Sequence, residues 1–480
     1  MLQTALPGLA DRVREAREYA LSRGLLKYDA QGQVVHLPFT LTPWQAPEHF
    51  VQQLHSLAGP FNRLYARVSH DHDFLRQTLE PAARTDEFVS RMLACLPEDP
   101  PERPELFLTR NDFMPLQTPE GPSPRQVEIN MIAASLGPAS QKVNDLQRFL
   151  YREEDLGRRI LPTRPGDEQI RVLVQAWKLF GDPQARILFV LPPGEMGVFD
   201  QLTLASDLVL EHGAPMLRCT MEELGREGEI RGGDLWFRGR RVAMGYFRGG
   251  YAPAHYEGEY SWKARRLLEA STAISVPSIP AQLANMKMVQ GRLTSPEVLR
   301  RYLLDSEAEA VAATFVVMAS PSEEVTWNGR CAPARDLALA FPEDWILKPQ
   351  REGGGNNLYG QDMVRRLQAM HPAEEPAFIL MEYIRPAAFH SVRLVENEPV
   401  EGLCLTEFGT FGAFLMEPGG LEKPLVDEDL GYLLRTKDHQ SREGLVIGGY
   451  AALDVLALEE PTRLSGPEGG NPSADPVTRA

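Results

Sequence analysis

Short apolar runs alternate with helical patterns between residues 183 and 285, and this alternation limits the possible folds more than any other feature of the chain. Short apolar runs predict buried strands, and the amphipathic segments between them predict helices. The predicted elements are a strand over 186–191, a helix over 198–211, and strands over 215–219, 234–237 and 241–247. Such alternation is typical of a largely parallel sheet covered by helices. We therefore predict an α/β protein in which residues 183–285 form one α/β unit.

The segment before this unit has mainly helical spacing. Leu9, Val13 and Ala16 recur at intervals of three or four residues, with charged residues on the opposite face. Helical patterns also cover residues near 46–80 and 84–95. The dipeptide Gly59-Pro60 and the residue Pro81 are expected to interrupt them, because proline breaks or kinks a helix.

The segment after the unit begins with helical spacing over 295–340 and then becomes mixed. The further predicted elements are strands over 344–348, 378–382 and 399–408 and a helix over 361–369. Residues 459–480 carry only Leu464 and Val477 as large apolar side chains, which predicts a disordered tail.

Charge limits the function classes. The chain has 480 residues with 50 basic and 66 acidic side chains, a formal net charge of −16. At about 100–200 residues per domain, this length predicts two to four compact units. The acidic balance argues against a surface that holds nucleic acid electrostatically, so we expect no nucleic-acid partner.

Cysteine usage and hydropathy indicate the cellular compartment. Cys95, Cys219, Cys331 and Cys404 lie far apart in sequence, which excludes a thiolate zinc site and a disulfide scaffold and predicts a reducing cytoplasm. The longest apolar stretch, 310–319, is about half of the roughly 20 residues that a membrane-spanning helix needs. The N-terminus has no apolar signal core. We therefore expect a cytoplasmic protein without a membrane partner.

A glycine-rich loop is the strongest local signal for chemistry. Apolar residues 345–347 predict a strand that leads into Lys348, and Glu352 and the glycines 353–355 follow. Successive glycines allow backbone N–H groups to turn towards one anion, a lysine adds a point charge, and a carboxylate can hold a divalent cation. The loop matches neither the Walker nor the dinucleotide fingerprint. For the loop on its own, the alternative is a flexible turn between a strand and a helix.

A second signal lies upstream, where Val127, Ile129 and Met131 alternate with Glu128 and Asn130. On a strand, this alternation places the carboxylate and the amide on one face. Carboxylate and amide oxygens suit magnesium, which usually shares its coordination with phosphates. The same pattern also describes a strand with a polar outer face, and this segment alone favours that simpler interpretation.

Two further segments could contact a nucleotide or an anionic substrate. Residues 378–384 could present backbone groups to an adenine edge, although such apolar strands are more often core. The cations of 434–437, followed by the glycine-rich 443–449, could clamp an anion or could form a surface hairpin. No nucleophile motif competes with these signals. Cations, carboxylates and phosphate loops together favour phosphoryl transfer, in which positioning and charge neutralisation provide most of the catalysis.

Taken in order, these segments resemble the eukaryotic-type glutathione synthetases of the ATP-grasp superfamily, from about residue 9 to residue 456. The most specific block is LKPQREGGGNNLYG at 347–360. The supporting blocks are QVEIN at 126–130, VFDQ at 198–201, YFRGGY at 246–251, QLANMK at 282–287, ILMEYI at 379–384, TEFGTFGAF at 406–414 and LLRTK at 433–437.

The resemblance implies ATP- and Mg²⁺-dependent ligation of γ-glutamylcysteine to glycine through an acyl phosphate, and a homodimer. It also implies an ATP-grasp core with an inserted α/β substrate-binding domain and a lid. The implied divisions are a helical part with the first core segment over 1–182, the insert over 183–285, the remaining core over 286–458, a lid over about 333–400 and a substrate loop over about 438–449.

The site residues that the resemblance implies fall into four groups. Those next to the reacting groups are Arg110, Lys348 and Arg435. The magnesium ligands are Glu128, Asn130 and Glu352. The ATP contacts are Glu128, Lys287, Lys348, Gly353, Gly354, Gly355, Asn356, Asn357, Tyr359, Met381, Glu382, Tyr383, Ile384, Glu407 and Lys437. The substrate contacts are Arg110, Ser135, Glu195, Gln201, Arg248, Tyr251, Arg435, Val446 and Ile447.

The sequence departs from the family pattern at four places. A serine-rich motif is reduced to Ile132-Ala-Ala-Ser135, Gly197 and Gly249 replace Asn and Asp, and an alanine-rich loop carries Ile447. The acceptor amino acid therefore stays open, with a β-alanine-using homoglutathione synthetase or a ligase for another small amine as the alternative, because one methylene shifts preference by only about 1–3 kcal/mol. A catalytically silent nucleotide-binding scaffold is the other alternative, and it would be expected to lack a metal ligand or a phosphate-binding cation.

Overall fold

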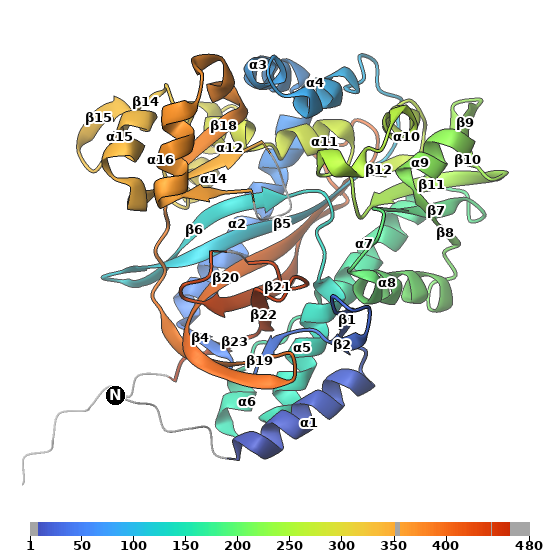
Figure 1. Cartoon of the computed structure of the whole chain (residues 1–480). Coiled ribbons are helices and arrows are strands. Elements are labelled where there is room, and N and C mark those ends of the chain that lie inside the picture. The colour runs from blue at the N-terminus through green and yellow to red at the C-terminus, as the bar shows by residue number, and fades with distance from the viewer. Residues whose placement is uncertain (1–7, 351–355, 443, 461–480) are drawn as a thin grey trace, which may run out of the picture.

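A curved, mostly antiparallel sheet lies at the centre of the molecule (Figure 1). The computed structural model describes residues 8–350, 356–442 and 444–460. In spatial order, the seven strands are β19 (Phe389–Val395), β3 (Phe39–Thr40), β22 (Ala451–Asp454), β21 (Val426–Asp438), β20 (Glu398–Met416), β5 (Glu105–Thr118) and β6 (Gly121–Asn130). β19 also pairs with β20, so the sheet curls back on itself.

Both faces of this sheet are buried. Along β20, Ala413 and Leu415 enter one apolar core, whereas Phe414 and Met416 enter the other, as the two-residue period of a strand requires. The first core is completed by α1 (Leu9–Ser22), α5 (Gly137–Leu150) and α7 (Pro165–Phe180). The second is completed by α2 (Glu48–His70), α3 (His72–Ala83), α4 (Glu87–Ala94), α11 (Ile279–Ala284), α12 (Lys287–Leu293), α13 (Pro296–Leu299) and α14 (Asp305–Ala312).

The region between residues 183 and 285 forms a second sheet beside the first (Figure 1). Its strands run in the order β8 (Met216–Thr220), β7 (Arg186–Leu191), β11 (Arg240–Phe247), β10 (Asp234–Phe237) and β9 (Gly228–Arg231), and β12 (Ile274–Val276) also pairs with β11. Its helices are α8 (Val198–Leu210), α9 (Met221–Glu227) and α10 (Glu259–Glu269). β7, β8, β11 and β12 are parallel, which confirms the predicted α/β class. The strand predictions missed β9 and β12, which are short.

A smaller unit lies across the central sheet from this one (Figure 1). Its four-stranded sheet has the order β13 (Met318–Ala319), β18 (Phe378–Glu382), β16 (Trp345–Pro349) and β17 (Leu358–Tyr359). It carries α15 (Ala334–Ala340), α16 (Gly360–Ala369) and the hairpin β14 (Glu324–Trp327)–β15 (Arg330–Pro333). The predicted strands at 344–348 and 378–382 and the predicted helix at 361–369 are present.

The predicted helical regions are mainly helical, but short strands interrupt them, and the breaks expected at the prolines are absent. Strands β1 (Leu26–Tyr28), β2 (Val34–His36), β3 and β4 (Trp44–Ala46) interrupt the first hundred residues, and β13–β15 interrupt 295–340. Helix α2 continues through Gly59-Pro60, and α3 includes Pro81. An interior proline costs about 3 kcal/mol, but α2 buries one whole side on the central sheet, and this packing outweighs the local cost.

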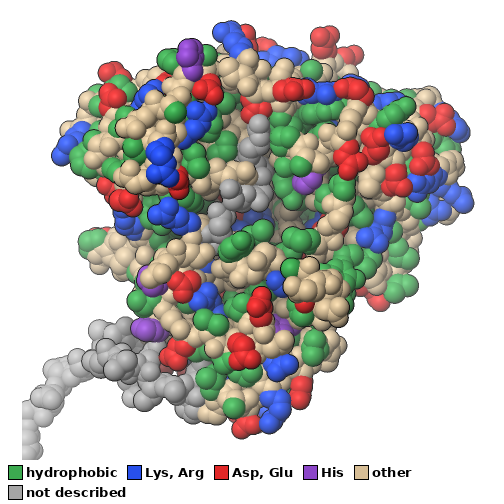
Figure 2. Space-filling view, in the orientation of Figure 1, with side chains coloured by type: hydrophobic (Ala, Val, Ile, Leu, Met, Phe, Trp, Pro, Cys, Tyr) green, Lys and Arg blue, Asp and Glu red, His purple; other side chains and the backbone are tan. Residues whose placement is uncertain are grey.

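The remaining elements are β23 (Leu456–Leu458), which pairs with β4, the short α6 (Asp155–Arg159), and the 3-10 helices η1 (Pro253–His255), η2 (Pro342–Asp344) and η3 (Pro372–Ala377). Basic and acidic side chains intermingle over the face shown in Figure 2. None of the described helices has the length and apolarity needed to span a bilayer. Most of the predicted tail, residues 461–480, lies outside the described ranges, and the predicted domain and lid boundaries stay predictions.

Candidate active site

A cavity of about 590 Å³ is bordered by all three units of the fold. From the small sheet and its loops, it is lined by the predicted residues Lys348, Asn357, Tyr359, Met381, Tyr383 and Ile384. From the central sheet, it is lined by Arg110, Glu128, Asn130, Glu407, Arg435 and Lys437. From loops that follow β6, β7 and β11 and precede β22, it is lined by Ser135, Glu195, Arg248, Tyr251, Val446 and Ile447. The structure therefore brings most of the predicted residues together.

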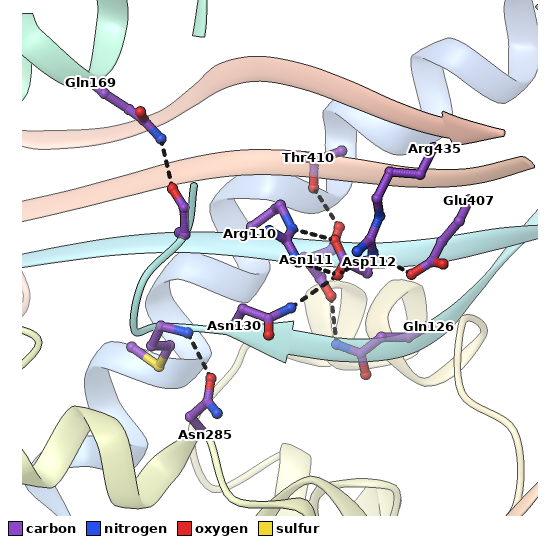
Figure 3. A network of polar contacts seen from close by, with 12 residues as sticks. Arg110, Asn111, Asp112, Gln126, Asn130, Gln169, Asn285, Glu407, Thr410 and Arg435 are labelled. Carbon is purple, nitrogen blue, oxygen red and sulfur yellow. Dashed lines mark hydrogen bonds and ion pairs between the residues drawn. The ribbon is translucent and has the colours of Figure 1, made fainter. Parts of the chain in front are cut away.

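A fully buried carboxylate, Asp112, lies beneath the cavity lining and holds two of its arginines (Figure 3). Arg110 donates from Nε and Nη2 to its two oxygens, both at 2.8 Å, and Arg435 donates from Nη2 at 2.8 Å. Arg435 also pairs with Glu407 on β20. Residues two apart on a strand share a face, so β5 places Arg110 and Asp112 side by side. Asp112 and Glu407 thus hold two arginine side chains in fixed positions.

Glu128 lies next to this group on β6. Its Oε2 is 3.5 Å from Nζ of Lys287, which begins α12. Burial raises the pKa of Glu128, but the charges of Lys287, Lys348, Arg435 and Arg110 oppose burial and together lower the pKa from 4.5 to about 2. The carboxylate is therefore ionised at neutral pH, in a strongly positive surrounding.

Two of the three predicted magnesium ligands, Glu128 and Asn130, lie in the described part of the chain. About 25% of the Glu128 side chain is exposed, and Glu128 and Asn130 both line the cavity. Asn130 donates Nδ2 to Asp112 at 3.0 Å, which leaves its Oδ1 as the acceptor for a cation. The two oxygens suit a hard cation that keeps other ligands. The third predicted ligand, Glu352, lies outside the described residues, and no cluster of three or more His, Cys, Asp or Glu forms within them.

Several buried polar groups at the loop side of the cavity lack a partner among the described residues. They are both amide atoms of Gln201, Nε and Nη1 of Arg248, and Oε2 of Glu195. Arg248 is held by Asp200, with its Nη2 3.4 Å from Oδ2, and it is 3.8 Å from Glu195. Buried polar groups are nearly always hydrogen-bonded in native proteins. Unpaired donors and acceptors beside a cavity therefore indicate a polar ligand.

A few predicted residues do not face the cavity. Glu382 accepts from Nε1 of Trp327 at 3.0 Å, because its neighbours Met381 and Tyr383 face the cavity and the strand alternates. Gln201, Lys287 and Asn356 are absent from the lining, although Lys287 reaches Glu128. The predicted Gly353, Gly354 and Gly355 lie outside the described residues.

Asp112, Asp200 and Arg442 were not predicted from the sequence. Asp112 could have been found, because it lies two residues after Arg110 in the same apolar segment and shares its face. Asp200 accepts from the backbone N–H groups of Leu136 at 3.1 Å and Ala139 at 3.2 Å. These partners lie more than 60 positions away in sequence, so no local pattern predicts the contact.

Arg442 lines the cavity, with its guanidinium carbon 5.0 Å from the centre of the Tyr359 ring. The two residues come from different units of the fold, and the stacking therefore joins the small sheet to the segment after β21. Only the folded chain brings them together.

Comparison with known proteins agrees with this geometry. The family described as eukaryotic glutathione synthase, ATP binding domain, matches residues 8–458. Glutathione synthetase from Homo sapiens is 36% identical over 467 residues, covering 93% of this chain and 96% of that protein. A chloroplastic glutathione synthetase from Solanum lycopersicum is 35% identical over 459 residues, covering 91% and 82%.

The fold also recurs among solved structures. A glutathione synthetase-like effector from Globodera pallida, in its apo form, aligns with a TM-score of 0.75 over 95% of this chain and 98% of that chain, at 20% identity. This likeness extends the shared fold to a distant sequence. The match over residues 8–458, together with relatives above 30% identity over almost the whole chain, shows that the chain belongs to the eukaryotic glutathione synthase family.

Proposed function

We propose that the protein joins γ-glutamylcysteine to glycine with ATP, giving glutathione, ADP and phosphate. One observation carries the proposal: Glu128, Lys348 and Arg435, which come from distant segments, line one cavity, and Lys287 reaches Glu128 from outside its lining. Phosphoryl transfer needs fixed positive charge next to a metal-binding carboxylate.

In the first step, an oxygen of the dipeptide's C-terminal carboxylate attacks the γ-phosphorus of ATP. The bond to ADP breaks, and an acyl phosphate forms. Two anions must approach each other, and Lys287, Lys348 and Arg110 offset their repulsion. A magnesium ion held by Glu128, Asn130 and the predicted Glu352 would neutralise phosphate charge.

In the second step, the glycine amine attacks the acyl carbon, the bond to phosphate breaks, and the amine loses a proton. We place Arg435 at the acceptor end, where its bonds to Asp112 and Glu407 fix its direction. An acyl phosphate must be kept from water, so closure of the cavity is part of this proposal. The boundaries of the lid are predicted from the resemblance alone.

The dipeptide is proposed to occupy the loop side of the cavity. The free donors of Arg248 can hold a carboxylate, and the free oxygen of Glu195 can accept from an ammonium group. The γ-glutamyl end of the dipeptide carries both groups. Gln201, on α8 behind this wall, has an unpaired donor and an unpaired acceptor but does not line the pocket itself.

The alternatives make different predictions. A silent scaffold should lack a phosphate-binding cation or a metal ligand, whereas Glu128, Asn130, Lys287 and Lys348 all lie at or beside the cavity. For the acceptor, glycine follows the family, and β-alanine or another small amine stays an alternative.

We also propose a homodimer in a reducing, cytoplasmic setting. The cysteines support the second part of this proposal, since all four lie in the described ranges and are free thiols. Three of them, Cys95, Cys219 and Cys404, are buried. Mass measurement in solution would test the dimer.

The decisive assay measures phosphate release by the purified protein with ATP, magnesium, γ-glutamylcysteine and glycine. Release is expected only when all four are present, because each half-reaction needs its own substrate in place. ATP turnover that is indifferent to the dipeptide would refute the substrate assignment. Replacing glycine with β-alanine or serine in the same assay then identifies the acceptor.

A further inference from the structure

The 444–450 loop, which joins β21 to β22, forms part of the cavity wall. Gly444, Leu445, Val446 and Ile447 line the cavity. The loop is folded on itself by bonds from the Gly449 N–H to the Val446 carbonyl at 2.9 Å and from the Tyr450 N–H to the Leu445 carbonyl at 3.1 Å. Val446 is buried in the core, whereas the remainder of the loop is more exposed. The exposed part needs another contact to keep its position.

That contact comes from Lys27 on β1, 420 positions away in sequence. Nζ of Lys27 donates to the carbonyl oxygen of Ile447 at 3.0 Å. A Cβ built on Gly449 would lie 3.7 Å from the same Nζ, so the lysine end extends across the turn. Lys27 is partly buried, which restricts its side chain to few conformations.

The hairpin that carries Lys27 also touches the helix beside the pocket. The ring of Tyr28 lies 5.1 Å from the ring of Phe199 on α8. Helix α8 begins at Val198, next to Gly197, and carries Gln201. The β1–β2 hairpin therefore contacts both the 444–450 loop and the helix at the loop side of the cavity.

The side chain of Ile447 extends towards this same end. A Cβ on Gly197 would be 3.3 Å from Cδ1 of Ile447, 3.3 Å from Nη2 of Arg248 and 2.7 Å from Oε1 of Glu195. Glycine at 197 thus leaves the space into which the tip of Ile447 fits. The Ile447 tip and the unpaired groups of Arg248 and Glu195 share one wall of the cavity.

We propose that Lys27 is a positioning residue for ligation. By holding the Ile447 carbonyl, it keeps the Ile447 side chain against Gly197, and so closes the dipeptide end of the cavity. This inference rests on the proposed function, because it takes γ-glutamylcysteine as the ligand at that end. The nucleotide end, which is lined by the small sheet, does not involve Lys27.

The test is Lys27→Met, which removes the donor and keeps most of the aliphatic chain. We expect the KM for γ-glutamylcysteine to rise about tenfold, as loss of one charge-assisted bond implies, with the KM for ATP within about twofold of its original value. Lys27→Arg keeps a donor and should restore most of the loss. Lys178→Met, at an exposed lysine on α7, is the matched control and should change neither KM.

Hydrogen exchange provides a readout that does not depend on turnover. In Lys27→Met, the amides of 444–450 should exchange faster while those of β16 and β18 keep their rates. A wild-type protein without ligase activity would refute the proposed function, yet the exchange result would still test the contact. Unchanged exchange and KM in Lys27→Met, or equal rises in both KM values with a lower Tm, would overturn the role of Lys27.

Discussion

Single residues in and beneath the cavity lining act through the charges of their neighbours. Asp112 is fully buried and accepts from Arg110 and Arg435, and therefore its role is to hold these cations. Glu128 is partly open to the cavity and keeps a low pKa, and therefore it stays available to a cation from solution. Two acidic groups in one site thus have different tasks because their exposure differs.

Replacing Glu128 tests the metal assignment at this scale. Glu128→Gln keeps the shape of the side chain but removes the charge, and we expect the magnesium concentration for half-maximal rate to rise at least about tenfold. Glu297→Gln, at an exposed position, is the control. The measurement is a magnesium titration of phosphate release. A curve that coincides with that of the wild type would remove Glu128 from the metal site.

Among the elements, helix α2 and strand β20 depend on a close approach. Asn62 on α2 donates to the carbonyl of Ala413 and to that of Glu428, both at 3.2 Å. A Cβ on Gly412 would lie 2.3 Å from Oδ1 of Asn62 and 2.7 Å from Oγ1 of Thr109. A glycine at 412 is therefore needed for the helix to reach the sheet.

A second glycine on β20, Gly402, provides a control for the effect of the close contact at Gly412. Gly412→Ala should lower the free energy of unfolding by about 1–3 kcal/mol, because the added methyl overfills a packed contact. Gly402 lies on the same strand, and a Cβ added there would have no atom within 4 Å. Gly402→Ala should therefore change the free energy of unfolding by less than about 0.5 kcal/mol. Denaturant unfolding measures both. Equal effects would show that the contact with α2 does not limit position 412.

At the scale of the whole molecule, the central sheet curls back on itself and buries a carboxylate in the interior of the protein. Asp454 on β22 is fully buried and accepts from Oγ1 of Thr40 and Oγ1 of Thr436, both at 2.6 Å. Burial raises its pKa from 3.8 to about 6, even though these hydrogen bonds oppose the shift. The folded protein therefore binds this proton more tightly than the unfolded chain does.

The pH dependence of stability follows from that difference. The contribution of Asp454 to the free energy of unfolding is fully present below pH 3.8 and is lost as the pH rises through about 6. The free energy of unfolding falls by about 3 kcal/mol over this range. Asp454→Asn removes this titration, so its stability relative to the wild type should increase between pH 4 and pH 7. Urea unfolding at both values, with exposed Asp99→Asn as the control, measures the change. A constant difference between variant and wild type would contradict the raised pKa.

Much of the fold could be predicted because local periodicity reports burial. The strands at 186–191 and 234–237 match β7 and β10 in their bounds, and the helix predicted over 361–369 matches α16 to within one residue. The predictions failed where packing outweighs local propensity. Pro60 stays inside α2 because the helix is held by the sheet beneath it.

The site shows the same difference between what local patterns predict and what packing decides. Local sequence patterns were enough to predict the chemistry: a strand with Glu128 and Asn130 on one face, cations at Lys348 and Arg435, and motifs shared with a family of known relatives. The tertiary structure alone decided which charges meet, including Asp112 between two arginines and Lys27 on the Ile447 carbonyl. The physical reason is distance along the chain. Periods of 2 and 3.6 residues fix which face a side chain occupies, whereas its partner, 420 positions away for Lys27, depends on how the sheets and helices pack.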